Sequence, residues 1–385
     1  MRLSRDPAAR RRLLALAALA ALAALVGLIV GASSGSDPGR RSTASAPATA
    51  RETNRPTAAP RSLDADLGEL IMLRFAGTSP PAYVTRALRE HRTPGAILFR
   101  DNIASPVQLR DLTRALQSSA GGRALVATDQ EGGPVRNVAS AGPAASATAA
   151  GEPAALQTAT RDAGRQLRAL GVNVDLAPVA DVPSVAGAAL AGRAYARDPA
   201  QVSAFVGAAV RGYTQGGVAA TAKHFPGLGG ATTNTDQAPV DVSTSLADLR
   251  DRDLPPFAAA VRAGVPLVMV GHARYPTVDP AHIASQSPRV YELLRGEVGF
   301  RGVAVTDSLE ARAVIARSSV DDAGLASIRA GADLLLTTGR GSFIRIYRRL
   351  RAEARHSATL RTRIGEAADR VRALQDRLQA PPPGG

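Results

Sequence analysis

Short apolar runs rich in β-branched residues recur through residues 62–378, and longer stretches rich in Ala, Leu and Arg with helical periodicity separate them. The short runs predict strands at residues 71–75, 95–99, 125–129, 174–179, 220–225, 267–273, 302–307 and 334–338. The longer stretches predict helices at residues 81–91, 106–120, 153–170, 200–212, 255–263, 287–298 and 320–330, with a closing helix at about 342–378.

Strands that alternate with helices at this spacing form right-handed βαβ units around a parallel sheet. Eight such units can close into a TIM-type (β/α)8 barrel, and the length of this segment is ordinary for one. An open doubly wound sheet is the alternative, but no glycine-rich dinucleotide turn follows the first strand. We therefore predict one α/β barrel domain at residues 62–378 and a disordered tail at 379–385.

The residues before this domain have a different pattern. Five arginines within residues 1–12 precede an uncharged apolar run at residues 13–32. As a helix this run would reach roughly 30 Å, the thickness of the hydrocarbon core of a bilayer. Residues 1–32 are therefore expected to be a retained signal anchor or a cleaved signal peptide, which places the barrel outside the cytoplasm. Residues 33–61, rich in Ser, Thr, Pro and Ala, are expected to form a disordered tether.

The net charge of +14 is not spread evenly along the chain. Residues 1–61 hold ten arginines and three acidic residues, so half of the excess lies before the barrel. Only 3% of the residues are aromatic, and the remaining basic surface suits an anionic wall or lipid surface better than a nucleic-acid groove. We expect the protein to contact a membrane through its N-terminal segment and to have no nucleic-acid partner. Without cysteine, the chain has neither disulfides nor thiolate metal sites.

In a closed barrel, the residues that follow the strands gather at one end and build the site. Polar clusters follow six of the predicted strands: Arg100-Asp101-Asn102, Asp129-Gln130-Glu131, Asp181, Lys223-His224, Gly271-His272-Ala273-Arg274 and Thr306-Asp307-Ser308. Six clusters at equivalent positions indicate a shared site rather than solvated turns.

Several roles are open to individual residues of these clusters. Asp307 could be a nucleophile, a general base or the partner of an arginine, and Asp129 could accept two sugar hydroxyls or pair with an arginine. Lys223 is the only lysine in the chain, which indicates that a compact ammonium is required there rather than a guanidinium. His224 and His272 have no third ligand at a recognisable metal spacing, so we expect no metal site.

A glycine-rich stretch at residues 227–236 follows the Lys-His pair and ends in Asp236. Such a composition has little reason to hold one shape, and two interpretations are equally open. Either a mobile loop brings Asp236 over the pocket, or the loop is disordered and the carboxylate is solvated.

Four segments resemble successive motifs of glycoside hydrolase family 3, in its single-domain bacterial β-N-acetylhexosaminidase branch. They are Asp129-Gln130-Glu131-Gly132-Gly133, Gly192-Arg193-Ala194-Tyr195, Lys223-His224-Phe225-Pro226-Gly227 and Thr306-Asp307-Ser308-Leu309. The resemblance implies a retaining mechanism with Asp307 as the nucleophile. It also implies that the non-reducing-end sugar is held by Asp129, Arg193, Lys223 and His224. His272, at the end of the sixth predicted strand, is a further expected substrate-binding residue.

The chain departs from the branch at the acid/base. The branch supplies a histidine two residues after an aspartate of the loop, whereas this chain has Asp236-Gln237-Ala238. Pro134 also stands where the branch usually has Arg. Asp236 could act directly, another loop group could substitute, or the protein could bind glycan without cleaving it well.

These observations predict an exo-acting β-N-acetylhexosaminidase that hydrolyses wall-derived glycans, with Asp307 and Asp236 as the catalytic residues and without a cofactor. A glycan-binding or wall-sensing pseudoenzyme that retains the sugar pocket is the main alternative. A lyase that forms a Schiff base with Lys223 is a third possibility.

Overall fold

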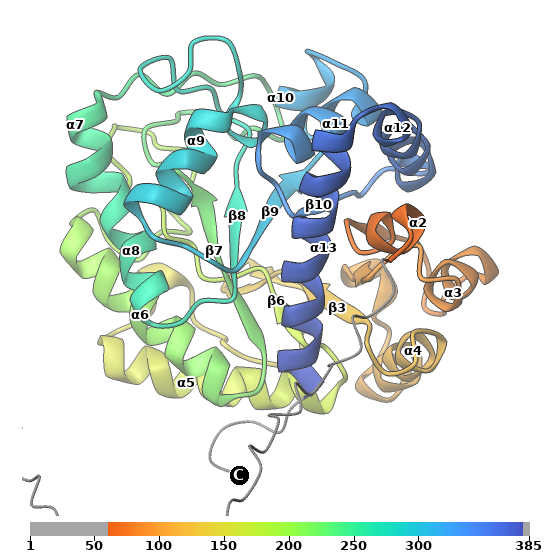
Figure 1. Cartoon of the computed structure of the whole chain (residues 1–385). Coiled ribbons are helices and arrows are strands. Elements are labelled where there is room, and N and C mark those ends of the chain that lie inside the picture. The colour runs from red at the N-terminus through yellow and green to blue at the C-terminus, as the bar shows by residue number, and fades with distance from the viewer. Residues whose placement is uncertain (1–60, 380–385) are drawn as a thin grey trace, which may run out of the picture. The chain divides into compact units, whose positions relative to one another are not determined.

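The computed structural model describes residues 61–379. The predicted signal segment, the tether up to residue 60 and the tail from residue 380 lie outside the described residues. Eight parallel strands form a closed barrel in the order β1-β10-β9-β8-β7-β6-β3-β2, which confirms the predicted (β/α)8 fold (Figure 1). Among residues 61–379, no helix is both long and apolar enough to span a membrane.

The barrel strands are β1 (Ile71–Arg74), β2 (Gly95–Ile97), β3 (Leu125–Thr128), β6 (Val174–Asp175), β7 (Ala219–Phe225), β8 (Leu267–Val270), β9 (Val303–Ser308) and β10 (Leu334–Leu336). The short β6 differs most from its predicted run, because Pro178 has no N–H for the ladder and pairing resumes only at a bridge between Val179 and Lys223. A hairpin of β4 (Gln130–Gly132) and β5 (Val135–Arg136) follows β3 and was not predicted.

The main helices are α3 (Ala82–Arg89), α4 (Pro106–Ser119), α5 (Pro153–Ala169), α6 (Pro199–Gln215), α8 (Leu254–Arg262), α9 (Pro288–Glu292), α11 (Val320–Ala330), α12 (Ser342–His356) and α13 (Ala358–Gln379). Shorter helices are α2 (Leu63–Leu67), α7 (Leu246–Asp248) and α10 (Arg312–Ile315), and α9 continues as a π-helical segment, Leu293–Glu297.

The prediction of one closing helix is wrong, because α12 and α13 are separate helices. Ser357 between them has an extended backbone, and its hydroxyl accepts a hydrogen bond from the N–H of Leu360. A serine in this conformation caps the following helix instead of continuing the preceding one.

Alternate residues of each strand face the barrel interior and the surrounding helices, as the pleat of a strand requires. The interior is filled by side chains such as Met72, Ala127 and Val305, together with Val371 and Leu374 of α13. Helix α13 therefore closes the end of the barrel at which the strands begin. The opposite end, where the strands finish, remains open for a site.

Candidate active site

A cavity of about 550 Å³ lies at the end of the barrel where the strands finish. Six of the seven predicted site residues line it: Asp129, Arg193, Lys223, His224, Asp236 and Asp307. They come from four βα segments, those of β3, β6, β7 and β9, and these segments meet only because the sheet closes. The floor includes Ile97, Leu176, Met269 and Leu336, which also belong to the cluster that fills the barrel. The cavity is therefore a pocket with a closed bottom and not a channel.

Lys223 is the centre of a buried ion-pair network. Its Nζ lies 2.6 Å from Oδ1 of Asp129 and 2.7 Å from Oε1 of Glu131. Arg193 binds the same Glu131 in a bidentate manner, with Nε 2.8 Å from Oε2 and Nη2 2.5 Å from Oε1. Two carboxylates and two cations thus hold one another in fixed positions on the cavity wall.

The pKa values of this network follow from its ion pairs. Burial alone would raise the pKa of Glu131, but Lys223 and Arg193 outweigh it and lower the value to about 2. Burial alone would lower the pKa of Lys223, but the charges of Asp129 and Glu131 raise it above its ordinary value. Lys223 is therefore held as an ammonium, and the neutral amine that a Schiff base requires is disfavoured.

Glu131 is a site residue that the sequence interpretation missed. It stands two positions after Asp129, and this spacing gave a signal, because residues two apart in an extended segment share a face. The carboxylate of Glu131 is 6% exposed and joins Lys223 to Arg193, so it organises the network.

His224 is oriented by a buried carboxylate. Its Nδ1 lies 2.7 Å from Oδ2 of Asp181, and the other oxygen of Asp181 accepts the N–H of Leu228 at 2.6 Å. One carboxylate therefore fixes both the imidazole and the beginning of the glycine-rich loop. Lys223 and His224 both line the cavity, although neighbours on a regular strand face opposite sides; the register of β7 against β8 shifts between Ala222 and Phe225.

His272 is not among the described residues that line the cavity, and its expected contact with substrate stays a prediction. The side chain is fully buried, with Nδ1 2.8 Å from Oγ of Ser285 and Nε2 2.9 Å from the carbonyl oxygen of Ser308. Burial lowers the pKa of His272. The imidazole thus supports the segment that carries Asp307.

Asp307 and Asp236 have opposite pKa shifts. Burial alone would raise the pKa of Asp307, but His224, His272, the N–H of Ser308 and Lys223 lower it. That N–H donates to Oδ1 of Asp307 at 2.7 Å. Asp236 lies at the rim, where desolvation of its carboxyl and the negative charge of Asp307 raise its pKa. The cavity therefore separates the pKa values of its two carboxyl groups, with that of Asp307 lowered and that of Asp236 raised.

The loop that carries Asp236 is packed against its neighbours, so the alternative of a disordered loop is not observed. The N–H of Arg312 donates to the carbonyl of Asp236 at 3.4 Å, and the N–H of Ser184 donates to the carbonyl of Gly229 at 3.0 Å. A Cβ atom at Gly229 would lie 1.8 Å from the carbonyl oxygen of Val182. The glycines permit this close approach of two backbones.

Fold and site together define a class of protein. A (β/α)8 barrel with two carboxylates at its mouth, beside a network of fixed donors and acceptors, is an arrangement found in glycosidases. Within residues 61–379, no group of three or more His, Asp or Glu side chains is arranged to hold a metal ion. The family described as "Glycosyl hydrolase family 3 N terminal domain" matches residues 62–374, and the chain belongs to this family of glycoside hydrolases.

Individual relatives agree with this assignment. The chain is 34% identical over 278 residues to a beta-hexosaminidase of Stenotrophomonas maltophilia. The aligned region covers 69% of this chain and 82% of that protein. It is 32% identical over 329 residues to an uncharacterized secreted glycosyl hydrolase of Arthroderma benhamiae, covering 81% and 93% of the two chains. A family 3 β-N-acetylglucosaminidase from Paenibacillus sp. superposes with a TM-score of 0.79 at 32% identity, over 84% of this chain. This chain spans 64% of the length of that longer enzyme.

Proposed function

We propose that the protein is a retaining exo-β-N-acetylhexosaminidase in which Asp307 is the nucleophile and Asp236 is the acid/base. The observation that carries the proposal is that Asp236 and Asp307 line one cavity together with the Lys223 ion-pair network. The opposite directions of their pKa shifts agree with the two roles. The names of the Stenotrophomonas and Paenibacillus relatives support an N-acetylhexosamine as the sugar.

The reaction proceeds in two halves. In the first, ionised Asp307 attacks the anomeric carbon while Asp236 gives its proton to the glycosidic oxygen, so the bond to the leaving sugar breaks and a glycosyl-enzyme ester forms. In the second, Asp236 as a carboxylate takes a proton from the water that attacks the anomeric carbon. The ester bond breaks, which frees the hexosamine and restores Asp307.

The sugar that is cleaved off would be held by the ion-pair network. Asp129, Glu131, Arg193 and Lys223 are fixed before substrate arrives, so they can bind hydroxyls with little reorganisation. Nδ1 of His224 is hydrogen-bonded to Asp181, so Nε2 remains available to bind the substrate. The closed bottom of the cavity supports exo action, because only the end of a glycan chain can enter such a pocket.

We also propose that the barrel acts outside the cytoplasm on glycans derived from the cell wall. The basic and apolar N-terminal sequence supports this location, as does the secreted description of the Arthroderma relative. N-terminal sequencing of the protein from fractionated cells distinguishes a retained anchor, which keeps residues 1–32, from a cleaved signal peptide.

The activity is tested with 4-nitrophenyl β-glycosides that differ only at C2. The parent should hydrolyse the N-acetylglucosaminide faster than the glucoside. Asp307→Ala should keep less than about a thousandth of the parent rate, because no glycosyl-enzyme can form without that carboxylate. Asp111→Ala, which removes an exposed carboxylate of α4, is the matched control and should be fully active. Binding of N-acetylglucosamine oligomers without hydrolysis of either aryl glycoside would favour the pseudoenzyme instead.

A further inference from the structure

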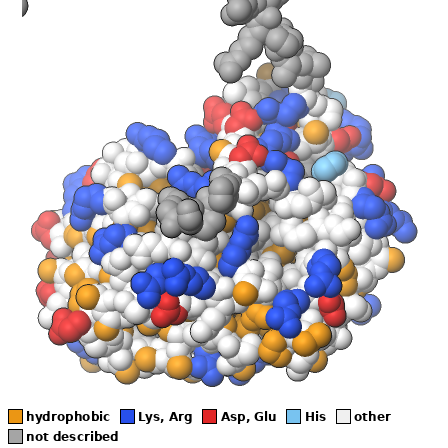
Figure 2. Space-filling view, turned by 90° about the horizontal axis from the view of Figure 1, so that it is seen from below, with side chains coloured by type: hydrophobic (Ala, Val, Ile, Leu, Met, Phe, Trp, Pro, Cys, Tyr) orange, Lys and Arg blue, Asp and Glu red, His pale blue; other side chains and the backbone are white. Residues whose placement is uncertain are grey.

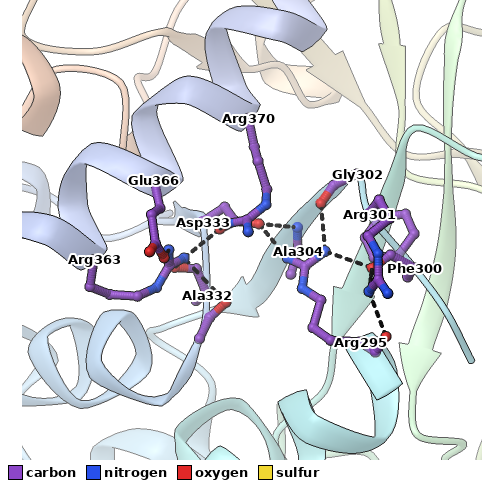
Figure 3. Close-up of polar contacts among 11 residues, drawn as sticks. Arg295, Phe300, Arg301, Gly302, Ala304, Ala332, Asp333, Arg363, Glu366 and Arg370 are labelled. Carbon is purple, nitrogen blue, oxygen red and sulfur yellow. Dashed lines mark hydrogen bonds and ion pairs between the residues drawn. The ribbon is translucent and has the colours of Figure 1, made fainter. Parts of the chain in front are cut away.

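At the end of the barrel opposite the catalytic cavity, one buried carboxylate is surrounded by three arginines (Figure 3). Asp333, directly before β10, is fully buried and pairs with Arg295, Arg363 and Arg370. Glu366 contributes a second negative charge, 3.2 Å from Arg363. Three guanidiniums and two carboxylates leave this cluster with an excess of positive charge.

The excess has an electrostatic consequence for the arginines. Burial lowers the pKa of Arg295, and the nearby charges of Arg370 and Arg363 lower it further, although Asp333 opposes them. The guanidiniums thus repel one another. An additional anion next to the cluster would be stabilised by this surplus charge.

Arg370 connects the cluster to a second cavity of about 400 Å³, which lies between α13 and the segments that precede β8 and β9. Arg301 and Arg377 line the same cavity, and none of the described residues that line it is acidic. The rest of the lining is largely apolar and includes Val261, Val265, Phe300, Val303 and Leu374. Figure 2 views the end of the barrel where the strands begin. Several basic side chains (blue) lie there among hydrophobic side chains (orange) and uncharged surface (white).

The arginines of this cavity retain free donors. Nη1 of Arg301 donates to the carbonyl oxygens of Arg295 and Phe300, at 2.6 and 3.3 Å, which leaves its Nη2 and Nε. Arg377 makes no side-chain hydrogen bond or ion pair with any residue between 61 and 379. Free guanidinium groups beside a positively charged cluster form a binding site for an anion with several acceptor oxygens.

A neighbouring cavity of about 360 Å³ on the other side of α13 provides a contrast. It also contains two arginines, but Arg123 pairs with Asp376 at 2.8 Å and Arg168 donates to the carbonyl of Leu378 at 2.8 Å. Each of its arginines therefore has a polar partner among the described residues. Arg377, which has none there, and the excess charge of the Asp333 cluster distinguish the Arg301–Arg370–Arg377 cavity.

We propose that the cavity lined by Arg301, Arg370 and Arg377 binds a phosphate mono- or diester carried on an apolar stem. The guanidiniums would hold the phosphate oxygens, and the apolar wall of Val261, Phe300 and Leu374 would cover the stem. A phospholipid headgroup and a free phosphate ester share this chemistry. The site lies at the other end of the barrel from Asp307, so it adds a binding function that does not depend on hydrolysis.

The test is isothermal titration calorimetry of the full chain with inorganic phosphate and, separately, with dihexanoyl-phosphatidylglycerol below its micelle concentration. Arg377→Ala should weaken binding of both probes by about tenfold, because one charge-assisted contact is lost, and Arg377→Glu should abolish it. Tighter binding of the lipid than of phosphate supports contact of the stem with the apolar wall, whereas equal affinity would overturn that contact and leave a site for the anion alone.

The matched control is Arg110→Ala, which removes an exposed arginine of α4 that has no side-chain partner among residues 61–379. Its affinity for both probes should equal that of the parent. No binding by the parent, an unchanged affinity in Arg377→Glu, or an equal loss in Arg110→Ala would overturn the proposal. Hydrolysis of the aryl glycoside by Arg377→Ala should match the parent, which shows that the variant is folded whatever the calorimetry gives.

Discussion

Asp236 and Asp307 are chemically identical side chains whose pKa values the cavity shifts in opposite directions. The hydrogen bond from the N–H of Ser308 and the charges of His224 and Lys223 lower the pKa of Asp307. Desolvation and the negative charge of Asp307 raise the pKa of Asp236. The first half of the proposed reaction needs Asp307 ionised and Asp236 protonated. Activity should therefore fall at low pH as Asp307 takes up a proton, below the usual aspartate range, and at high pH as Asp236 loses one, above that range.

Asp236→Ala should lower kcat/KM for natural disaccharides by about 10² to 10⁴, because the leaving sugar is no longer protonated. The burst of nitrophenolate that reports glycosyl-enzyme formation from an aryl substrate should change far less, since that leaving group needs no proton. The fall of activity at high pH should also be absent when Asp236→Ala hydrolyses the aryl substrate. Equal losses on both substrates would contradict the assignment of Asp236 as the acid.

Ala238→His tests whether the missing histidine limits the parent. The substitution restores the aspartate-x-histidine spacing of the bacterial β-N-acetylhexosaminidase branch. Asp236 lines the cavity, however, and Ala238 is not among the described residues that line it. We therefore expect no gain on unactivated disaccharides. An increase of about tenfold or more would mean that the parent lacks an effective acid.

Lys223→Arg keeps the charge but changes its shape. The lysine side chain is 2% exposed, and Glu131 already receives both donors of Arg193, so a second planar fork has no room between the two carboxylates. We expect a raised KM and a lowered kcat for aryl N-acetylglucosaminide. Unchanged values of both would show that a compact ammonium is not required; thermal unfolding of the variant separates a binding defect from loss of fold.

At the scale of the element, the turn after β7 positions both His224 and the loop that carries Asp236. Gly227 in this turn has φ +130°, and an added Cβ would lie 2.7 Å from Cβ of Asp253. Asp253 is 1% exposed, and desolvation raises its pKa to about 6 against the effect of Arg252. A side chain at Gly227 therefore meets both a disfavoured backbone conformation and a packed neighbour.

Gly227→Ala should destabilise the protein by about 2–5 kcal/mol, which combines backbone strain with overpacking, and should lower kcat by displacing the loop. Gly77→Ala is the matched control, because φ is +92° but no atom lies within 4 Å of the added Cβ. The control should show only the strain, about 1–3 kcal/mol, with full activity. Denaturant unfolding and aryl-glycoside kinetics measure the two effects; equal unfolding free energies for both variants would rule out the contact with Asp253.

At the scale of the whole molecule, Asp333 joins parts of the chain that are distant in sequence. It binds Arg295 from the segment after α9 and Arg363 and Arg370 from α13, while Oδ2 accepts the N–H of Ala304 in β9 at 2.9 Å. This carboxylate fastens α13 across the end of the barrel (Figure 3).

Asp333→Asn should reduce the free energy of unfolding by about 3–5 kcal/mol, since buried guanidiniums would lose their shared counter-charge. Asp376→Asn is the matched control on the same helix, because Asp376 is exposed and pairs with a single arginine, Arg123, at 2.8 Å. The control should cost about 0–1 kcal/mol. Urea unfolding measures the loss of unfolding free energy in each variant. Similar losses in Asp333→Asn and Asp376→Asn would contradict a special role for Asp333.

The sequence by itself determined the barrel. Strand positions follow from local apolar runs and helices from their own periodicity, so each is visible without its neighbours. The pattern failed where a single residue altered the backbone, as at Ser357, which divides the closing helix, and at Pro178, which shortens β6. The sequence also indicated which strand ends carry chemistry, because an acid or lysine directly after a buried run has a specified place in a barrel.

Only the tertiary structure decided how these residues act on one another. The bridge of Glu131 between Lys223 and Arg193, and the contact of His272 with the carbonyl of Ser308, depend on closure of the sheet. The opposite pKa shifts of Asp236 and Asp307 depend on distances between residues that are far apart in the chain. Electrostatic energy depends on separation and burial in space, and neither quantity is contained in the local pattern of the sequence.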